Sequence, residues 1–250
     1  TTLTVAENTS LPQTQIEQRV NDYLGIDDYI LVADAQGQYI EHIDCWAKLL
    51  APDKILVDSV PSSDSQYSMY EAAAAYFAST NCAYGYPYKV YRPLIAGSAE
   101  TSTAEPYSNS FIFNNRVFVP IKGGTSAPHD TAALQCYRKA MPGYIVKGYT
   151  SGGSQVWYGT DALHCRTHEI ADREMLYIEH YPLYGLINAY PSYEINAKVV
   201  SYAENSIETD YPTVIYRINQ GSWDSVPMTT ISNHQYQGLM PTQNSGDTIY

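Results

Sequence analysis

The chain has 250 residues, of which 44% are apolar, and a formal net charge of −12 from 14 basic and 26 acidic side chains. This length and apolar content support one large domain, or a domain with a smaller appendage. The scarcity of Lys and Arg argues against nucleic acid as a ligand, and the absence of any run of about 18 apolar residues excludes a membrane-spanning helix.

The first part of the chain alternates between expected strands and helices. The helix nearest the start is indicated by Ile16, Val20 and Leu24, which are spaced four apart on one face. In chain order, we expect a strand at 3–5, a helix at 12–24, strands at 29–33 and 55–57, a helix at 71–77, strands at 88–91 and 111–120 with a turn near Asn114-Asn115, a helix at 131–139 and a strand ending at 149. This rhythm predicts an α/β domain of small repeated modules, although no residue-level repeat can be counted.

After about residue 190 the helical period disappears. Short runs of Tyr, Val and Ile alternate with polar turns, which is typical of a β-sandwich. About 60 residues remain, fewer than the roughly 100 of a complete immunoglobulin-like sandwich. We therefore expect one domain over residues 1–190 and a partial immunoglobulin-like β domain over 191–250.

Three segments could carry chemistry, and the first contains His42 and Asp44. Two residues apart on an extended stretch, their side chains would point to the same side and could meet one substrate. The alternative is that the two side chains simply hydrogen-bond each other in a loop.

The second segment places Cys165 among His164, Arg166 and His168, at an expected helix start. Such an electropositive setting favours the thiolate over the thiol. The two histidines are four apart, which raises zinc as an alternative, but HCRTH lacks the glutamate of the HExxH motif. His164 could also serve only to shape the loop, because it is adjacent to the cysteine rather than opposite it.

The third segment contains Asn109, just before an expected strand. Taken alone, an Asn in this position is most often a turn former. The other cysteines, Cys45, Cys82 and Cys136, lack CxxC spacing and are expected to be small buried apolar residues.

Together, four stretches resemble the bacterial peptidylarginine deiminases, in order and over about residues 3 to 195. They are YIEHIDCWAKLLAPDKILV, PYSNSFIFNNRVFVP, YRKAMPGY and GTDALHCRTHEIAD. The resemblance implies a pentein-type α/β propeller of ββαβ modules, about three of five being present in this chain, followed by an immunoglobulin-like domain.

The resemblance also implies a reaction, the hydrolytic deimination of peptidyl-arginine to peptidyl-citrulline and ammonia. Cys165 would attack the guanidinium carbon to give a thiouronium intermediate, and His42 would protonate the ammonia and then activate water. Asp44 would hold guanidinium nitrogens, because a carboxylate matches their planar fork of donors. Asn109 would complete the catalytic set, with Tyr39, Ile40 and Thr160 lining the substrate pocket.

One departure from the family pattern concerns a second guanidinium-binding Asp and the arginines that select a C-terminal carboxylate. In the family these come from N-terminal modules, and neither can be located here. The chain alone is therefore expected to carry an incomplete site, and assembly with a missing N-terminal segment or with neighbouring copies is an expected partnership.

The remaining expectations concern substrates, cofactors and alternatives. We expect arginine-containing peptides or proteins as substrates, no metal or other cofactor, and a secreted or extracellular protein, since 25 tyrosines and few lysines are typical of such surfaces. A small-molecule agmatine deiminase is one alternative. Another is a structural or assembly subunit on an inherited deiminase fold, with strand edges near 1–5 and 249–250 open to another chain.

Overall fold

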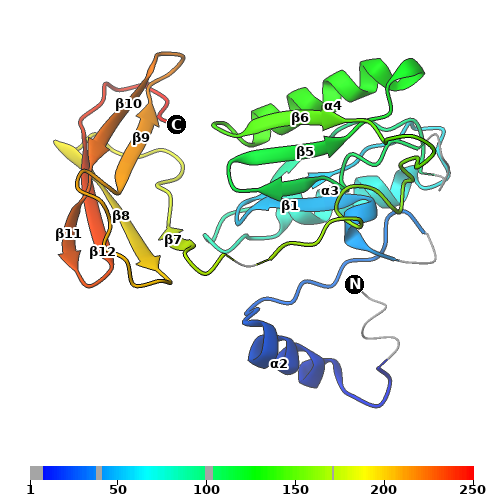
Figure 1. Ribbon diagram of the computed structural model, residues 1–250, viewed down its shortest axis with the longest axis horizontal. Coiled ribbons are helices and arrows are strands. Elements are labelled where there is room, and N and C mark those ends of the chain that lie inside the picture. Colours follow the sequence, from blue (N-terminus) through cyan, green and yellow to red (C-terminus); the bar gives the residue numbers. More distant parts are fainter. Residues whose placement is uncertain (1–7, 38–40, 99–103, 171) are drawn as a thin grey trace. The chain divides into compact units, whose positions relative to one another are not determined.

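A computed structural model of the chain describes residues 8–37, 41–98, 104–170 and 172–250. The chain divides into two compact units between His168 and Glu169 (Figure 1). This point lies before the boundary at 190/191 expected from the sequence, because strand β7 (Leu176–His180) pairs with strand β8 (Ser192–Ser201) of the second unit. Over the described residues, no helix is long and apolar enough to cross a membrane.

The first unit contains a ββαβ module between residues 47 and 91. Strands β1 and β2 pair antiparallel, and β3 then pairs parallel to β2 after a crossover through α3, giving the order β1-β2-β3. The elements are β1 (Ala47–Ala51), β2 (Lys54–Val57), α3 (Tyr67–Ser79) and β3 (Lys89–Tyr91).

A second module between residues 111 and 149 repeats this topology in the order β4-β5-β6. Its elements are β4 (Phe111–Phe113), β5 (Arg116–Pro120), the short 3₁₀ turn η2 (Gly124–Ser126), α4 (Ala127–Ala140) and β6 (Ile145–Tyr149). The hairpin turns at Asn114, whose φ of 51° suits asparagine. The predicted alternation is confirmed, but the described residues hold two complete modules rather than about three, and closure into a propeller stays a prediction.

The two modules share one apolar core. Helix α3 packs on β2 and β3, and α4 packs on β6 and β3 (Figure 1). A cross-module hydrogen bond runs from Lys54 Nζ to the backbone oxygen of Ala140 at 2.9 Å. The core includes fully buried residues from both modules, such as Ile55, Tyr70, Val117 and Tyr137.

Near the start of the chain, one predicted element is present and one is not. Helix α2 (Gln13–Leu24) forms as expected and ends at Gly25, whose φ of 66° is the left-handed conformation that glycine adopts readily. The strand expected at 29–33 is wrong, because this stretch pairs with no strand among the described residues. The apolar run has another explanation, since Ile30 and Val32 pack against the core from a loop. The strand expected at 3–5 lies outside the described residues.

The second unit is all β. One sheet has the antiparallel order β11-β12-β8-β7, and β9 and β10 form a separate hairpin. Its remaining strands are β9 (Thr213–Arg217), β10 (Trp223–Pro227), β11 (Thr229–Ser232) and β12 (Gln235–Pro241). The expected change to β structure is confirmed, while an immunoglobulin-like arrangement stays a prediction. The last residue, Tyr250, exchanges two backbone hydrogen bonds with Arg217, so this end is paired within the unit.

Candidate active site

The segment that carries Asp44 joins the first strand of module one. Residues Ile43–Cys45 form a 3₁₀ turn, η1, so the predicted extended conformation is wrong here. Glu41, just before it, has a φ of 46°, a strained value for this residue type. His42 and Asp44 nevertheless stay neighbours, with 3.9 Å between Nδ1 and Oδ1. This distance is too long for the local hydrogen bond that was the alternative reading.

Asn109 lies in a fully buried turn that enters β4. Its neighbour Ser108 donates through Oγ to the backbone oxygen of Asp44 at 3.0 Å. From α4, the hydroxyl of Tyr137 donates to the backbone oxygen of Tyr107 at 2.7 Å and lies 2.8 Å from Oγ of Ser110. The turn is thus fixed both by the segment that precedes β1 and by α4, which a simple surface turn would not require.

Cys165 lies in a series of turns rather than at a helix start, so that expectation is wrong. The guanidinium of Arg166 holds the loop together with a two-pronged ion pair to Asp161, at 3.0 Å from Nε to Oδ1 and 2.7 Å from Nη2 to Oδ2. The same guanidinium donates to the backbone oxygen of Val156 and lies over the ring of Trp157, 5.1 Å from its centroid. Arg166 therefore shapes the loop that carries Cys165.

The side chain of Asn109 joins Asp44 and Cys165 in one cluster. Its Nδ2 lies 2.9 Å from Asp44 Oδ2 and 3.1 Å from Cys165 Sγ. Its Oδ1 accepts from the backbone N–H groups of Ala162 and Cys165, both at 3.2 Å. These residues are far apart in the sequence, so the fold brings together three of the four predicted catalytic side chains, with His42 beside Asp44.

The electrostatic environment of Cys165 differs from the expected one. Partial burial raises the pKa of its thiol, the hydrogen bond from Asn109 opposes this, and the charge of Asp44 raises the pKa further. Sγ lies 3.5 Å from Asp44 Oδ2. The unliganded site therefore favours the thiol over the thiolate, contrary to the electropositive setting predicted from Arg166 and the histidines.

Two further residues reach this cluster, and neither was predicted to do so. His164 Nδ1 lies 2.6 Å from Asp44 Oδ2, although the sequence suggested only a role in loop shape. Lys48 on β1 is close enough for the charges of Asp44 and Cys165 to raise the pKa of its ammonium, while burial lowers it more strongly. The available signal was its position on the strand that directly follows His42 and Asp44.

The comparison with known families bears on this cluster of side chains. The family of Porphyromonas-type peptidyl-arginine deiminases matches residues 1–170, which include His42, Asp44, Asn109 and Cys165. The chain belongs to this family.

Individual relatives of this deiminase-family chain carry a different substrate name. A putative agmatine deiminase of Vibrio parahaemolyticus is 25% identical over 191 residues, covering 67% of this chain and 52% of the relative. One of Yersinia pestis is 28% identical over 202 residues, covering 68% and 53%. The chain thus spans about half the length of the curated relatives it matches.

A solved structure shows the same fold. The structure of a putative agmatine deiminase aligns with a TM-score of 0.51 at 22% identity, covering 63% of this chain and 47% of that one. The mixed α/β fold is therefore shared with deiminases.

The remaining predicted residues of this deiminase-family chain are less well placed. Thr160 is buried, and its backbone oxygen lies 3.6 Å from Cys165 Sγ. Tyr39 and Ile40 lie outside the described residues. Cys45, Cys82 and Cys136 are free thiols, of which the first two are buried. The part of the chain that the structure describes contains no group of three or more His, Cys, Asp and Glu arranged to hold a metal ion.

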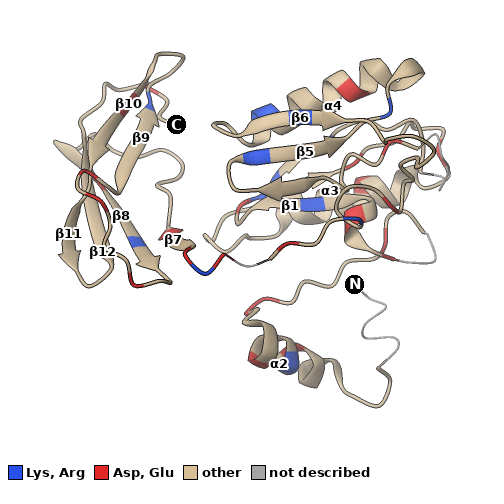
Figure 2. Cartoon of the chain, in the orientation of Figure 1, with Lys and Arg blue, Asp and Glu red and all other residues tan. Residues whose placement is uncertain are grey.

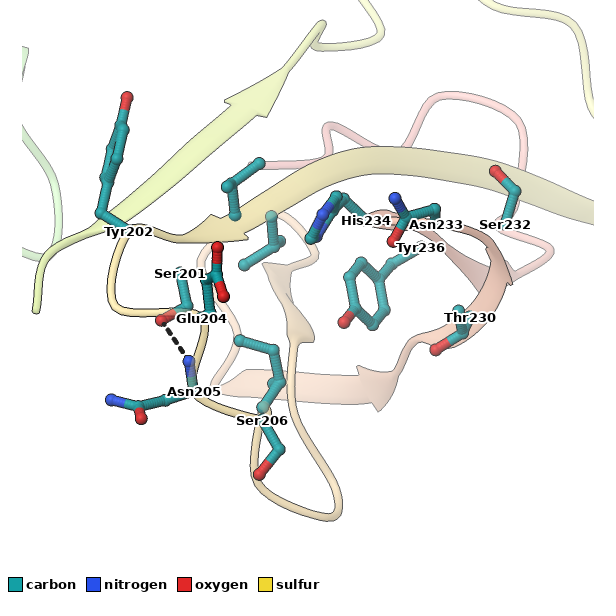
Figure 3. Close-up of a pocket in the computed structure, with 13 residues that line it drawn as sticks. Ser201, Tyr202, Glu204, Asn205, Ser206, Thr230, Ser232, Asn233, His234 and Tyr236 are labelled. Carbon is teal, nitrogen blue, oxygen red and sulfur yellow. Dashed lines mark hydrogen bonds between the residues drawn. The ribbon is translucent and has the colours of Figure 1, made fainter.

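A cavity of about 670 Å³ lies in the second unit, between the ends of β8, β11 and β12 (Figure 3). Its lining includes Glu204, Asn205, His234 and Tyr236, and one hydrogen bond there joins the backbone N–H of Asn205 to Ser201 Oγ. None of the predicted site residues lines this cavity, so it is separate from the cluster around Cys165.

Proposed function

We propose that this chain carries the nucleophile half of a hydrolase that converts the guanidino group of peptidyl-arginine into a ureido group and releases ammonia. The observation that carries the proposal is the contact of one buried amide, that of Asn109, with both Asp44 and Cys165. A carboxylate that can pair with a guanidinium thus lies beside a thiol that can attack its carbon.

In the proposed reaction, the guanidinium enters next to Asp44 and offsets the negative charge that, with burial, keeps the thiol of Cys165 protonated. The thiol proton passes to solvent, the thiolate attacks the guanidinium carbon, and ammonia leaves after protonated His42 donates a proton to it. A water molecule, deprotonated by His42, attacks the resulting thiouronium carbon, and the C–S bond breaks as the hydroxyl proton passes to the sulfur, which gives the ureido product and the free thiol. The balance is one guanidinium and one water for one urea group and one ammonium ion.

The choice of peptidyl-arginine rests on the family description, whereas the relatives are named agmatine deiminases. Both substrates present the same guanidinium to Asp44, so the cluster around Cys165 favours neither. The acidic chain would attract either cation: Asp and Glu are spread over both units in Figure 2, whereas Lys and Arg are few. Substrate-lining roles for Tyr39, Ile40 and Thr160 belong to the same proposal.

A peptidyl substrate agrees with a secreted or extracellular protein, the location favoured by the tyrosine-rich composition. Completion of the site by an N-terminal segment or by a neighbouring copy is part of the proposal, because the chain corresponds to about half of its relatives. The intact cluster of Asp44, Asn109 and Cys165 favours this enzyme role over a purely structural subunit.

The test measures ammonia and ureido product from agmatine and from peptides with internal and C-terminal arginine. It compares this chain with the full-length product of the gene that encodes it. Each is assayed with Cys165→Ala and with the matched control Cys136→Ala, which removes a half-buried thiol in α4. We expect release that Cys165→Ala abolishes and Cys136→Ala leaves in place, with peptides preferred over agmatine.

Two results would contradict parts of this proposal. A preference for agmatine would replace the peptidyl substrate but keep the reaction. No release from any of the substrates by the full-length product would remove the deiminase proposal and favour the assembly role.

A further inference from the structure

The contact between His164 and Asp44 is the shortest described hydrogen bond in the cluster around Cys165. Nδ1 of His164 lies 2.6 Å from Oδ2 of Asp44, and the two residues are 120 positions apart in the chain. An ionised carboxylate only accepts hydrogen bonds, so with Asp44 ionised it is Nδ1 that carries the hydrogen and donates it. The histidine side chain is about half exposed, at 49%, while that of Asp44 is 13% exposed.

The two oxygens of Asp44 have different surroundings. Oδ2 is the crowded one, with His164 Nδ1 at 2.6 Å, Asn109 Nδ2 at 2.9 Å and Cys165 Sγ at 3.5 Å. Oδ1 makes no hydrogen bond within the described ranges, and His42 Nδ1 lies 3.9 Å from it. One oxygen is therefore held by hydrogen bonds from the protein, and the other keeps its acceptor capacity.

We infer that His164 is a positioning residue, which together with Asn109 holds Oδ2 of Asp44 so that Oδ1 faces the substrate guanidinium. This inference rests on the proposed function for the identity of the substrate. The contact between His164 and Asp44 is independent of that function. His164 would act through Asp44 and would transfer no proton, a task left to His42. The neighbouring backbone supports this placement, because the N–H of His164 donates to the backbone oxygen of Asn109 at 3.0 Å.

The chain offers a precise set of variants. His164→Asn keeps an N–H donor at the place of Nδ1 but cannot transfer protons, while His164→Leu removes the donor at similar volume. If the leucine variant folds poorly, His164→Gln replaces it. Its amide lies at the place of Nε2, so it too lacks a donor at the place of Nδ1. His168→Leu is the matched control, since it removes the other, exposed histidine of the same loop.

The first experiment needs no substrate. The rate of Cys165 alkylation by iodoacetamide is measured against pH by mass spectrometry, in a double-mutant cycle of His164→Leu with Asp44→Asn. We expect His164→Leu to move the pH midpoint when Asp44 is present and to leave it in place in the Asp44→Asn background. His164→Asn and His168→Leu should both stay at the parental midpoint. Equal movement in both backgrounds, or an asparagine variant that behaves like the leucine variant, would overturn the inference.

The second experiment measures turnover of an internal-arginine peptide by the full-length gene product. Loss of a hydrogen bond to a charged group predicts a rise in KM of about ten- to hundredfold for His164→Leu, with kcat within about threefold and KM recovered in His164→Asn. A collapse of kcat in both variants would instead make His164 a proton-transfer group and overturn the inference. If no variant and no parent turns over, the proposed function fails, while the alkylation cycle still decides the role of His164.

Discussion

The thiol of Cys165 and the carboxylate of Asp44 lie 3.5 Å apart, from Sγ to Oδ2, although 121 residues separate them in the chain. Burial is the main cause that raises the pKa of the thiol, and the nearby charge of Asp44 raises it further. The hydrogen bond from Asn109 acts in the opposite direction and lowers it. The group that is proposed to bind the substrate cation therefore adds to burial in keeping the nucleophile protonated.

The first prediction concerns the charge of Asp44. Asp44→Asn removes the negative charge beside Sγ and should lower the pKa of Cys165. Alkylation of this thiol by iodoacetamide should therefore be faster at neutral pH, although deimination of the guanidino substrate is lost. The pH profile of Cys165 alkylation checks this. Asp22→Asn removes the same charge from the exposed part of α2 and should leave the profile unchanged. A profile that moves to higher pH in Asp44→Asn would contradict the prediction.

The second prediction concerns the buried amide of Asn109. Asn109→Ala leaves the backbone N–H groups of Ala162 and Cys165 without their acceptor, which costs about 1 to 3 kcal/mol for each group that water does not reach. Urea unfolding measures the loss. Asn115→Ala, in the exposed hairpin turn, should stay within about 0.5 kcal/mol of the parent. Equal stabilities for the two variants would show that the Asn109 hydrogen bonds contribute little.

The third prediction concerns the loop held by Arg166. Arg166→Ala removes the ion pair to Asp161 and the donor to Val156, so the stretch 156–168 should become more sensitive to protease. Arg166→Lys keeps the charge but not the planar fork, and should protect the loop only in part. Limited proteolysis with mass spectrometry checks both. Global stability should change by less than about 1 kcal/mol, because the ion pair is partly exposed. Identical cleavage of all three proteins would show that Arg166 does not order this loop.

The fourth prediction concerns Asp58, a fully buried carboxyl after β2. Burial raises its pKa well above the ordinary value, and the charge of Arg92 opposes this only in part. Above about pH 4 the unfolded chain releases the proton more readily than the folded one, so Asp58 lowers the free energy of unfolding increasingly as pH rises. Asp58→Asn should therefore raise Tm at neutral pH, with a gain that shrinks toward pH 4.

A contrasting carboxylate serves as the control for this prediction. Asp130 accepts hydrogen bonds from the Tyr107 hydroxyl and from the backbone N–H groups of Lys122 and Gly123. Asp130→Asn should lower Tm at neutral pH, because an amide cannot accept at both ends. The same sign of change in both variants would contradict the proposed difference between the two sites.

Local pattern explains which parts of the fold could be predicted from the sequence. Strands such as β2 and β5, with apolar runs bounded by turn residues, and helices α2, α3 and α4 follow from periodicity and turn chemistry. The strand expected at 29–33 was wrong because an apolar run indicates that a segment is buried. It does not indicate whether a neighbouring strand is there to pair with the backbone. The unit boundary was misplaced because pairing between β7 and β8 is a long-range property.

The candidate site shows the same division. Family motifs identified Cys165, Asn109, His42 and Asp44, but spacing along the chain carries no information on the contact from His164 to Asp44. It also misjudged Arg166, whose guanidinium pairs with Asp161 at 2.7 Å from Nη2 to Oδ2. The sign of the Cys165 pKa shift depends on such neighbours in space, so it required the fold.

The long spans between the members of the cluster have a consequence for folding. Contacts of Cys165 reach back 56 residues to Asn109 and 121 residues to Asp44. Forming the cluster therefore closes long loops, and the chain loses conformational entropy before these contacts can stabilise it. Neither ββαβ module can make the site by itself. The raised pKa of the Cys165 thiol should therefore be among the last native properties to appear during refolding, which makes the alkylation rate of this thiol a reporter of completed assembly of the first unit.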